Sequence, residues 1–101
     1  MATTDWDHAL ILASAQVVLF CRDNCVYCDR AKDLVVRERA PHRIIDISQH
    51  QRDATPGFAT YYNMVRETTR ARTVPIIFYE QAYVGGFEDL RNTLLFSSSN
   101  F

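Results

Sequence analysis

The chain has 101 residues, of which 48% are hydrophobic and 23% are charged, and its formal net charge is −1. This length supports one domain with a real core but hardly two, so we expect a single domain over residues 1–101. The nearly balanced charge, with arginines scattered along the sequence, gives no indication of nucleic-acid binding, and no apolar stretch is long enough to cross a bilayer.

A first helix is predicted from the apolar side chains that recur at helical spacing between Trp6 and Ala13. Thr4 is its expected N-cap. The segment is also similar to a signal sequence, but Asp5 and Asp7 precede its apolar part and no Lys or Arg does. An amphipathic helix is therefore the better interpretation.

A strand, a helix and a second strand follow. The apolar run Val17–Cys21 indicates a buried strand, and Asn24 is a suitable N-cap for the next helix, which Pro41 is expected to end. The run Ile-Ile-Asp-Ile at residues 44–47 indicates the second strand. A strand–helix–strand unit of this length predicts parallel pairing with a right-handed crossover.

The remaining elements are predicted from proline, glycine and apolar spacing. In chain order we expect a polar connection over residues 48–52, a helix capped by Thr55 with Pro56 in its first turn, strands over residues 74–79 and 82–84 joined by Glu80 and Gln81, and a short last helix that packs through Phe87, Leu90 and Leu94. This order predicts an α/β fold of the thioredoxin-like type, a four-stranded mixed sheet with helices on both faces. The order of the strands in the sheet is taken from known folds.

Three cysteines, Cys21, Cys25 and Cys28, lie close together in the sequence. With no export signal, this clustering favours a reducing, cytoplasmic compartment, where cysteines serve redox or metal chemistry. Cys25 stands at the predicted start of a helix, where free N–H groups and the helix dipole favour a thiolate, and Arg22 adds positive charge nearby. Cys28 follows one turn later on the same face. We therefore assign Cys25 as the nucleophile and Cys28 as the resolving thiol.

Other interpretations of the cysteines have less support. A structural zinc site needs four ligands, and the three histidines of the chain lack the spacing of a zinc finger. Cys21 ends a buried strand, so it is better explained as a core thiol than as a second redox partner.

A proline opens the third predicted strand, in Thr73-Val74-Pro75. Proline cannot donate to a strand ladder. If its bond to Val74 is cis, the backbone N–H and C=O of Val74 turn outward and can pair with an extended peptide. A trans proline on an edge strand is the simpler interpretation of this tripeptide taken alone.

Taken together, four segments resemble the glutaredoxin family over nearly the whole chain. In order, they are the strand that ends in Cys21-Arg22, the site Cys25-Val26-Tyr27-Cys28, the segment Arg72-Thr73-Val74-Pro75, and Gly85-Gly86 with Asp89 after it. Thioredoxins match less well, because their Trp-Cys-Gly-Pro-Cys site is missing and they lack the Gly-Gly-x-x-Asp segment. The resemblance implies a disulfide oxidoreductase of the dithiol type that takes part in electron transport with glutathione.

The resemblance also implies where glutathione binds. Arg22 is expected to face the glycine carboxylate, with help from Arg72. The backbone of Val74 would pair with the cysteinyl part, and Asp89 would engage the γ-glutamyl amine. The glycine pair allows close approach of the ligand, and the helix after it can hold the γ-glutamyl carboxylate. The full implied set is Arg22, Tyr27, Arg72, Thr73, Val74, Pro75, Gly85, Gly86, Glu88 and Asp89.

The chain departs from the family pattern at three places. Val26 replaces a common proline, and some family members without that proline bind a [2Fe–2S] cluster between two subunits. Phe87 stands where a small residue or Cys is usual, beside the acidic Glu88. Tyr62 occupies the region of the third helix where a polar Gln often contacts a carboxylate.

Three functions follow from this resemblance, and they rank in a clear order. The first is glutathione-dependent reduction of protein disulfides and protein–glutathione mixed disulfides, with no bound metal. The second is a glutathione-ligated [2Fe–2S] dimer, in which each chain supplies Cys25. The third is a redox-inactive binding module, which the intact cysteine pair disfavours. For the first we expect a monomer that binds glutathione and disulfide-containing or glutathionylated proteins, and neither nucleic acid nor membrane.

Overall fold

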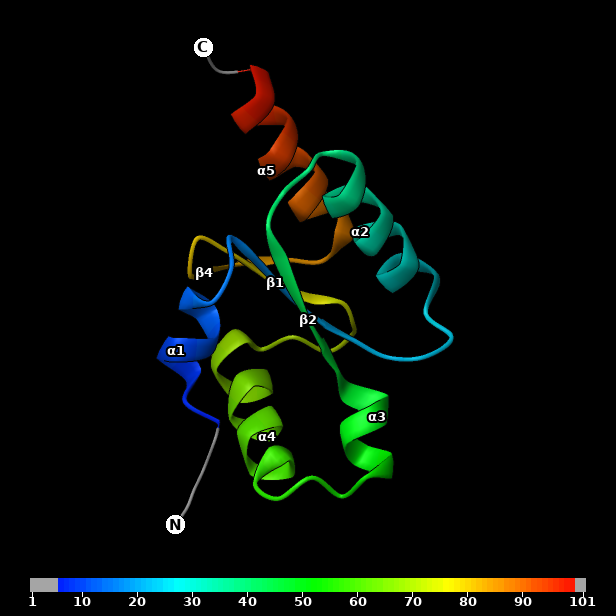
Figure 1. Ribbon diagram of the computed structural model, residues 1–101, viewed down its shortest axis with the longest axis vertical. Coiled ribbons are helices and arrows are strands. Elements are labelled where there is room, and N and C mark those ends of the chain that lie inside the picture. Colours follow the sequence, from blue (N-terminus) through cyan, green and yellow to red (C-terminus); the bar gives the residue numbers. More distant parts are fainter. Residues whose placement is uncertain (1–5, 100–101) are drawn as a thin grey trace.

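Four short strands form one mixed sheet in the computed structural model, which describes residues 6–99 (Figure 1). The strands are β1 Val17–Cys21, β2 His42–Asp46, β3 Ile76–Tyr79 and β4 Ala82–Gly85. They lie in the order β2-β1-β3-β4. β1 pairs parallel with β2 and antiparallel with β3, and β3 pairs antiparallel with β4.

The sheet is covered by helices on both faces, as the sequence predicts (Figure 1). The helices are α1 His8–Ala13, α2 Val26–Arg37, α3 Ile47–Arg52, α4 Phe58–Thr69 and α5 Phe87–Ser99. α2 and α5 pack on one face of the sheet, and α1, α3 and α4 pack on the other. Within residues 6–99, no helix is both long enough and apolar enough to cross a membrane.

β1 is the central strand, and all five of its residues are buried. Val17, Leu19 and Cys21 point into the core beneath α2 and α5, while Val18 and Phe20 point into the core beneath α1 and α4. Side chains alternate between the faces of a strand, so a strand with helices on both sides must be apolar throughout. This explains why its sequence is a continuous hydrophobic run.

The hairpin between β3 and β4 forms at the expected residues. Glu80 and Gln81 have φ angles of 48° and 73°. Two successive left-handed residues make the turn whose twist matches that of the flanking strands. β3 begins at Ile76 rather than at residue 74, and β4 extends to Gly85.

Two predicted helix caps on the N-terminal half differ from the structure. The N-cap of α1 is Asp7, whose carboxylate accepts from the N–H of Leu10 at 3.2 Å, whereas Thr4 lies outside the described residues. Asn24 is wrong as the N-cap of α2: its φ is 55°, and Cys25 takes the cap position. Asn tolerates the left-handed region, so Asn24 turns the chain one residue before the helix begins.

The end of α2 and the span of β2 also differ from the prediction. α2 ends at Arg37, well before Pro41, and Arg39 turns the chain with a φ of 56°. β2 runs from His42 to Asp46 rather than over residues 44–47. Pairing with β1 decides this register, and the pairing partner cannot be read from the local sequence.

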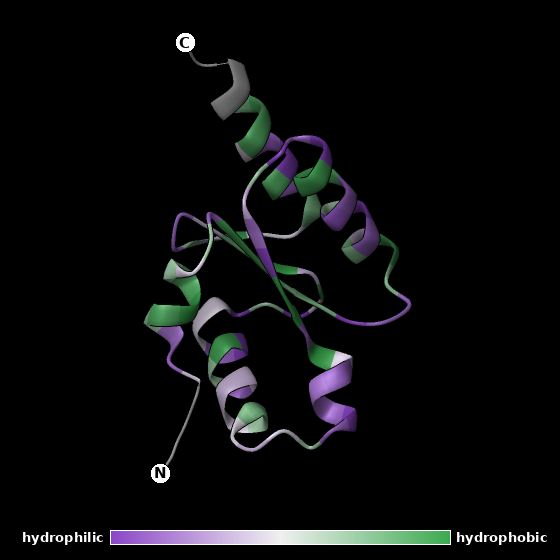
Figure 2. Ribbon diagram, in the orientation of Figure 1, coloured by the Kyte–Doolittle hydropathy of each residue, from purple (hydrophilic) through white to green (hydrophobic). Residues whose placement is uncertain are grey.

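The predicted polar connection at residues 48–52 is wrong, because these residues belong to α3. The carboxylate of Asp46 caps this helix by accepting from the N–H of Gln49 at 3.0 Å. Ile47 is its one buried residue, and the rest of the helix is hydrophilic (Figure 2). A six-residue helix with a single apolar anchor has no periodicity that a sequence search could detect.

α4 begins at Phe58, two residues later than expected. Gly57, with a φ of 80°, precedes the first helical residue Phe58, so Thr55 and Pro56 form the preceding turn instead of the cap and first turn. The carbonyl oxygen of Thr55 accepts from the N–H of Phe58 at 3.1 Å.

Candidate active site

Cys25 is the N-cap of α2. The backbone N–H of Cys28 donates to the Cys25 sulfur at an N–S distance of 3.2 Å. Cys25 is half-buried, so an incoming disulfide can reach it. A backbone N–H donor and the positive end of a helix dipole therefore both point at this sulfur.

Cys28 has the opposite environment, although it lies only one turn away. Its side chain is completely buried. Burial, together with the hydrogen bond to Cys25, raises the pKa of the Cys28 thiol far above its ordinary value. Cys28 is therefore a neutral thiol at neutral pH, whereas Cys25 is the accessible sulfur of the pair.

Cys21 lies at the end of β1 and is 1% exposed. Burial raises the pKa of its thiol to about 11, and a hydrogen bond with Cys28 opposes this rise only in part. Its surroundings are the apolar residues of the core beneath α2 and α5. Among the described residues, no group of three or more His, Cys, Asp or Glu side chains could hold a metal ion.

Val74 lies beside the cysteine pair. The Cys25 thiol donates to the carbonyl oxygen of Val74 at 3.8 Å, and the peptide bond between Val74 and Pro75 is cis. Val74 is half-buried and lines two separate clefts. The Cys25 sulfur thus lies next to the residue that separates these clefts.

The first of these clefts, the inner arginine cleft, has a volume of about 370 Å³. Arg22 and Arg66 both place their guanidinium carbons over the ring of Tyr62, at 5.7 and 5.6 Å from its centroid. The cleft is lined by Arg22, Tyr62, Arg66, Ala71, Arg72, Thr73, Val74 and Ile76. The inner arginine cleft is therefore strongly basic, and it lies on one side of Cys25.

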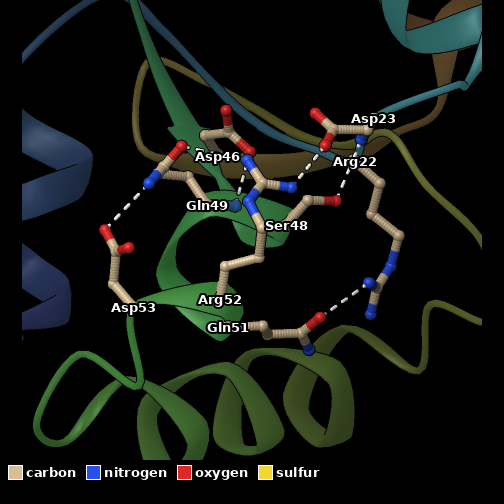
Figure 3. Close-up of polar contacts among 8 residues, drawn as sticks. All are labelled: Arg22, Asp23, Asp46, Ser48, Gln49, Gln51, Arg52 and Asp53. Atoms are coloured by element: carbon tan, nitrogen blue, oxygen red, sulfur yellow. Dashed lines mark hydrogen bonds and ion pairs between the residues drawn. The ribbon is translucent and has the colours of Figure 1, made fainter.

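The side chain of Arg22 is held in this cleft by α3 (Figure 3). Arg22 donates to the side-chain oxygen of Gln51 at 2.9 Å. The next residue, Asp23, receives two contacts from the same helix: its N–H donates to the Ser48 hydroxyl at 3.0 Å, and Arg52 forms an ion pair with its carboxylate at 2.6 Å. The loop that leads to Cys25 is thus fixed at three points to a helix that the sequence analysis missed.

The second cleft, the helix-start cleft, also has a volume of about 370 Å³ and lies at the N-terminus of α5. It is lined by Tyr27, Thr73, Val74, Pro75, Gly86, Phe87, Glu88 and Asp89. The ring of Phe87 contacts that of Tyr27 at a centroid distance of 6.2 Å. An acidic cleft therefore lies on the other side of Val74 from the basic one.

The acidic side chains of the helix-start cleft have partners of their own. The Asp89 carboxylate accepts from the N–H of Gly86 at 3.1 Å, so it caps α5 in this state. Glu88 forms an ion pair with Arg91 at 2.9 Å. Gly85 has a φ of 126°, and a Cβ at this position would collide with the Asp89 carboxylate. Only Gly85 of the glycine pair is required on conformational grounds.

The residues singled out in the sequence converge around Cys25, and two more join them. Every residue of the expected glutathione set except Gly85 lines one of the two clefts, and Gly85 stands directly before the helix-start cleft. Arg66 was missed, although it lies four residues after Tyr62 on the same face of α4 and that spacing could have revealed it. Phe87, expected to pack in the last helix and noted as a departure from the family pattern, forms part of a cleft wall.

The chain is similar to known proteins of one family. The family model for Glutaredoxin matches residues 17–84. The chloroplastic glutaredoxin-C4 of rice is 28% identical over 79 residues, which cover 78% of this chain and 56% of the rice protein. Glutaredoxin-1 of monkeypox virus is 29% identical over 82 residues, which cover 78% of this chain and 71% of the viral protein.

The fold is shared with a solved structure as well. Wheat glutaredoxin superposes with a TM-score of 0.68 and 27% identity, over 92% of this chain and 80% of the wheat chain. This likeness confirms the thioredoxin-like fold expected from the sequence. The chain spans little more than half of the length of the rice relative.

Proposed function

This chain belongs to the glutaredoxin family and carries a disulfide oxidoreductase domain of the glutaredoxin type, and we propose that its reductant is glutathione and that its mechanism uses both Cys25 and Cys28. The observation that carries the proposal is the position of the Cys25 sulfur, 3.8 Å from the Val74 carbonyl oxygen, between a basic and an acidic cleft. Glutathione has a carboxylate at its glycine end and an amine with a second carboxylate at its γ-glutamyl end. The charges of glutathione therefore match the basic cleft on one side of Cys25 and the acidic cleft on the other.

In the proposed complex the tripeptide lies across Val74 with its sulfur at Cys25. The glycine carboxylate faces Arg22 and Arg72, whose guanidinium groups bind carboxylates well. The γ-glutamyl amine faces Asp89, which exchanges its bond to the N–H of Gly86 for a bond to the amine. The freed N-terminus of α5 can then accept the γ-glutamyl carboxylate.

The first chemical step is attack of the Cys25 thiolate on one sulfur of a protein–glutathione disulfide. A bond forms between Cys25 and the glutathione sulfur, the original disulfide bond breaks, and the protein leaves as a thiolate that takes a proton from water. A second glutathione thiolate then attacks the glutathione sulfur. This releases oxidised glutathione and restores the Cys25 thiolate.

Protein disulfides need the second cysteine. After Cys25 has bonded to one protein sulfur, the Cys28 thiol gives its proton to the departing protein thiolate and attacks the Cys25 sulfur. The protein leaves with two thiols, and Cys25 and Cys28 form a disulfide that two glutathione molecules reduce. Because burial holds Cys28 protonated, this step is expected to be slower than attack by free glutathione.

Three cysteine variants test this mechanism. We expect Cys25→Ser to lower glutathione-coupled reduction of hydroxyethyl disulfide by roughly a hundredfold or more, because no other thiol is accessible. Cys28→Ser should retain deglutathionylation and lose the reduction of protein disulfides. Cys21→Ala is the matched control, because it removes a thiol from the same cluster without touching either cleft. Full activity of the Cys25→Ser protein would refute the mechanism.

The cluster-binding dimer is the second candidate, and the exposed Val26 is the observation that favours it. Val26 is 63% exposed where a proline is common in the dithiol members. One chain offers a single accessible thiolate, Cys25, so a [2Fe–2S] cluster with its four sulfur ligands would require a second chain and two glutathione thiols. Such a cluster would supply electron transfer or serve as cargo. Visible absorption after anaerobic purification with glutathione separates the two candidates, since the proposed reductase is a colourless monomer.

The partners and the compartment remain predictions. Disulfide-containing and glutathionylated proteins are the expected substrates. The clustering of cysteines is the basis for a cytoplasmic location. Mixed disulfides trapped by the Cys28→Ser variant and identified by mass spectrometry would name the partners.

A further inference from the structure

A second basic cleft extends away from the inner arginine cleft along the end of α4. We call it the outer arginine groove; it has a volume of about 640 Å³ and is lined by Asn63, Arg66, Glu67, Arg70, Ala71 and Arg72. We propose that this groove binds acidic side chains of the protein substrate, at positions that follow the attacked cysteine. The proposal rests on the proposed function and adds a substrate preference to it.

The outer arginine groove is continuous with the inner arginine cleft. Arg66, Ala71 and Arg72 line both of them, and the inner cleft reaches Val74, whose carbonyl oxygen lies 3.8 Å from the Cys25 sulfur. A chain bonded to Cys25 therefore has an uninterrupted path from the reacting sulfur to Arg70.

The charge of this surface exceeds what glutathione needs. One glycine carboxylate would face Arg22 and Arg72, and this leaves Arg66 and Arg70 without a role in glutathione binding. Across the described residues, neither of these two forms an ion pair, and Glu67 is the one acidic residue that lines the groove. A chain with a formal net charge of −1 thus gathers a net positive surface beside its reacting sulfur.

Stabilisation of the C-terminus of α4 does not explain the positions of all the arginines that line the groove. A basic residue in the last turn of a helix complements the helix dipole, and Arg66 occupies such a position. Arg70 is already the C-cap, with a left-handed φ of 61°, and Arg72 lies beyond the helix. Exposed guanidinium groups that converge on one groove provide bidentate sites for carboxylates.

The chain direction of glutathione in the proposed complex determines which substrate residues reach the outer arginine groove. If a substrate cysteine replaces the cysteinyl part of glutathione, the residue after it takes the place of glycine, beside Arg22 and Arg72. Residues two and three positions after the cysteine then continue toward Arg66 and Arg70. Residues before the cysteine extend instead toward the helix-start cleft, which is lined by Glu88 and Asp89 and by no arginine or lysine.

Two peptides of identical composition test this preference. Each has blocked ends and one cysteine in a mixed disulfide with thionitrobenzoate; one carries two Asp residues two and three positions after the cysteine, and the other carries them at the same distances before it. With Cys28→Ser as the background, Cys25 attacks the peptide sulfur and releases the coloured thionitrobenzoate thiolate. We expect the first peptide to react about fivefold faster at low ionic strength, and the difference to shrink at roughly 0.5 M salt.

Charge reversal in the outer arginine groove should remove the preference. Arg70→Glu is expected to make the two peptides react equally, and Glu67→Gln to enlarge their difference. Arg39→Glu is the matched control, because Arg39 is also exposed and left-handed with a φ of 56° but lies between α2 and β2. Equal rates for the two peptides in the Cys28→Ser protein, or equal effects of Arg70→Glu and Arg39→Glu, would overturn the inference.

The same proteins keep this inference separate from the proposed function. Hydroxyethyl disulfide has no charged group, so its glutathione-coupled reduction by the otherwise unaltered Arg70→Glu protein should equal that of the parent. If the parent protein itself did not reduce hydroxyethyl disulfide with glutathione, the proposed function would be refuted. A normal rate there, combined with equal peptide rates, would refute only the acidic-substrate preference.

Discussion

Cys25 is the N-cap of α2 and also the proposed nucleophile. A cap side chain normally accepts a bond from an N–H in the first turn, and Ser, Thr, Asp and Asn are the usual choices. Here sulfur takes this position and accepts from the N–H of Cys28 at 3.2 Å. The bond that fixes the start of α2 is therefore made to the sulfur of the proposed nucleophile, so the local fold and the proposed chemistry depend on the same two atoms.

At Gly85, both the backbone conformation and the contact with a neighbouring side chain require glycine. Its φ of 126° is open almost only to glycine, and a Cβ there would displace the carboxylate of Asp89 from the N–H of Gly86. We expect Gly85→Ala to lower the free energy of unfolding by about 2–4 kcal/mol, as the sum of backbone strain and a lost cap. Urea denaturation followed by circular dichroism measures this change.

Gly86→Ala is the neighbouring control for that experiment. A Cβ at Gly86 would lie 3.8 Å from the carbonyl oxygen of Pro75, which is ordinary contact. Its free energy of unfolding should stay within about 1 kcal/mol of the parent. If Gly85→Ala and Gly86→Ala lost the same stability, the positive φ of Gly85 and its contact with Asp89 would not explain the loss.

At the scale of elements, α3 is the helix that organises the approach to Cys25. It has six residues, one of them buried, and its polar side chains hold Arg22 and Asp23 (Figure 3). Such a short helix contributes little burial of apolar surface. Instead, it fixes Arg22 and Asp23 in the loop before Cys25, which orients Arg22 for the proposed glutathione complex.

Gln51 is the residue of α3 that tests this role. We expect Gln51→Glu to raise the KM for glutathione about fivefold, because a carboxylate at this position would compete with the glycine carboxylate for Arg22. Gln51→Ala, which only frees Arg22, should raise the KM about twofold, and kcat should change little in both variants. Steady-state kinetics with hydroxyethyl disulfide at varied glutathione concentrations separates KM from kcat.

Gln49→Glu is the matched control, since it adds the same charge to the same helix. Gln49 contacts Asp53 and Arg52 rather than Arg22. An equal rise in KM for Gln49→Glu and Gln51→Glu would mean that the effect comes from the charge of α3 as a whole and that Gln51 does not position Arg22.

At the scale of the whole molecule, the sequence predicts what depends on strong local patterns. The central strand, the helix after the cysteines, the two-residue turn at Glu80 and Gln81, and the two-sided sheet all follow from apolar runs and turn chemistry. α3 escapes prediction because its cap and its single buried residue, Ile47, act only once β2 has been paired with β1. The exact start of α4 likewise depends on Gly57 rather than on the stronger signal of Pro56.

The candidate site shows the same division between local and assembled features. The cysteine pair, the proline strand and the glycine pair carry recognisable motifs, so their residues can be named in advance. The basic surface is named only in part: the family resemblance points to Arg22 and Arg72, whereas Arg66 and Arg70, at the end of α4, belong to no such motif. Arginines that look scattered in the sequence become one surface only when the chain folds.

The buried thiols on one face of the sheet make the stability of the whole molecule sensitive to alkaline pH. Burial raises the pKa of Cys21 to about 11 and that of Cys28 still further, from an ordinary thiol value near 9. Between these values the folded protein keeps protons that the unfolded chain releases. Stability is therefore complete below about pH 8.5 and falls as the pH rises, with a slope that approaches about 2.7 kcal/mol per pH unit for two thiols.

Urea unfolding between pH 7 and 11, with a reductant present, measures this slope. The double variant Cys21→Ala and Cys28→Ala should be less stable at neutral pH, because it leaves cavities beneath α2, yet it should lose far less stability as the pH rises. Leu34→Ala is the control, since it makes a cavity in the same core without removing a thiol and should follow the slope of the parent. If the double variant kept the parent's slope, groups other than these thiols would have to release the protons on unfolding. The burial of Cys21 and Cys28 would then carry no cost in stability at high pH.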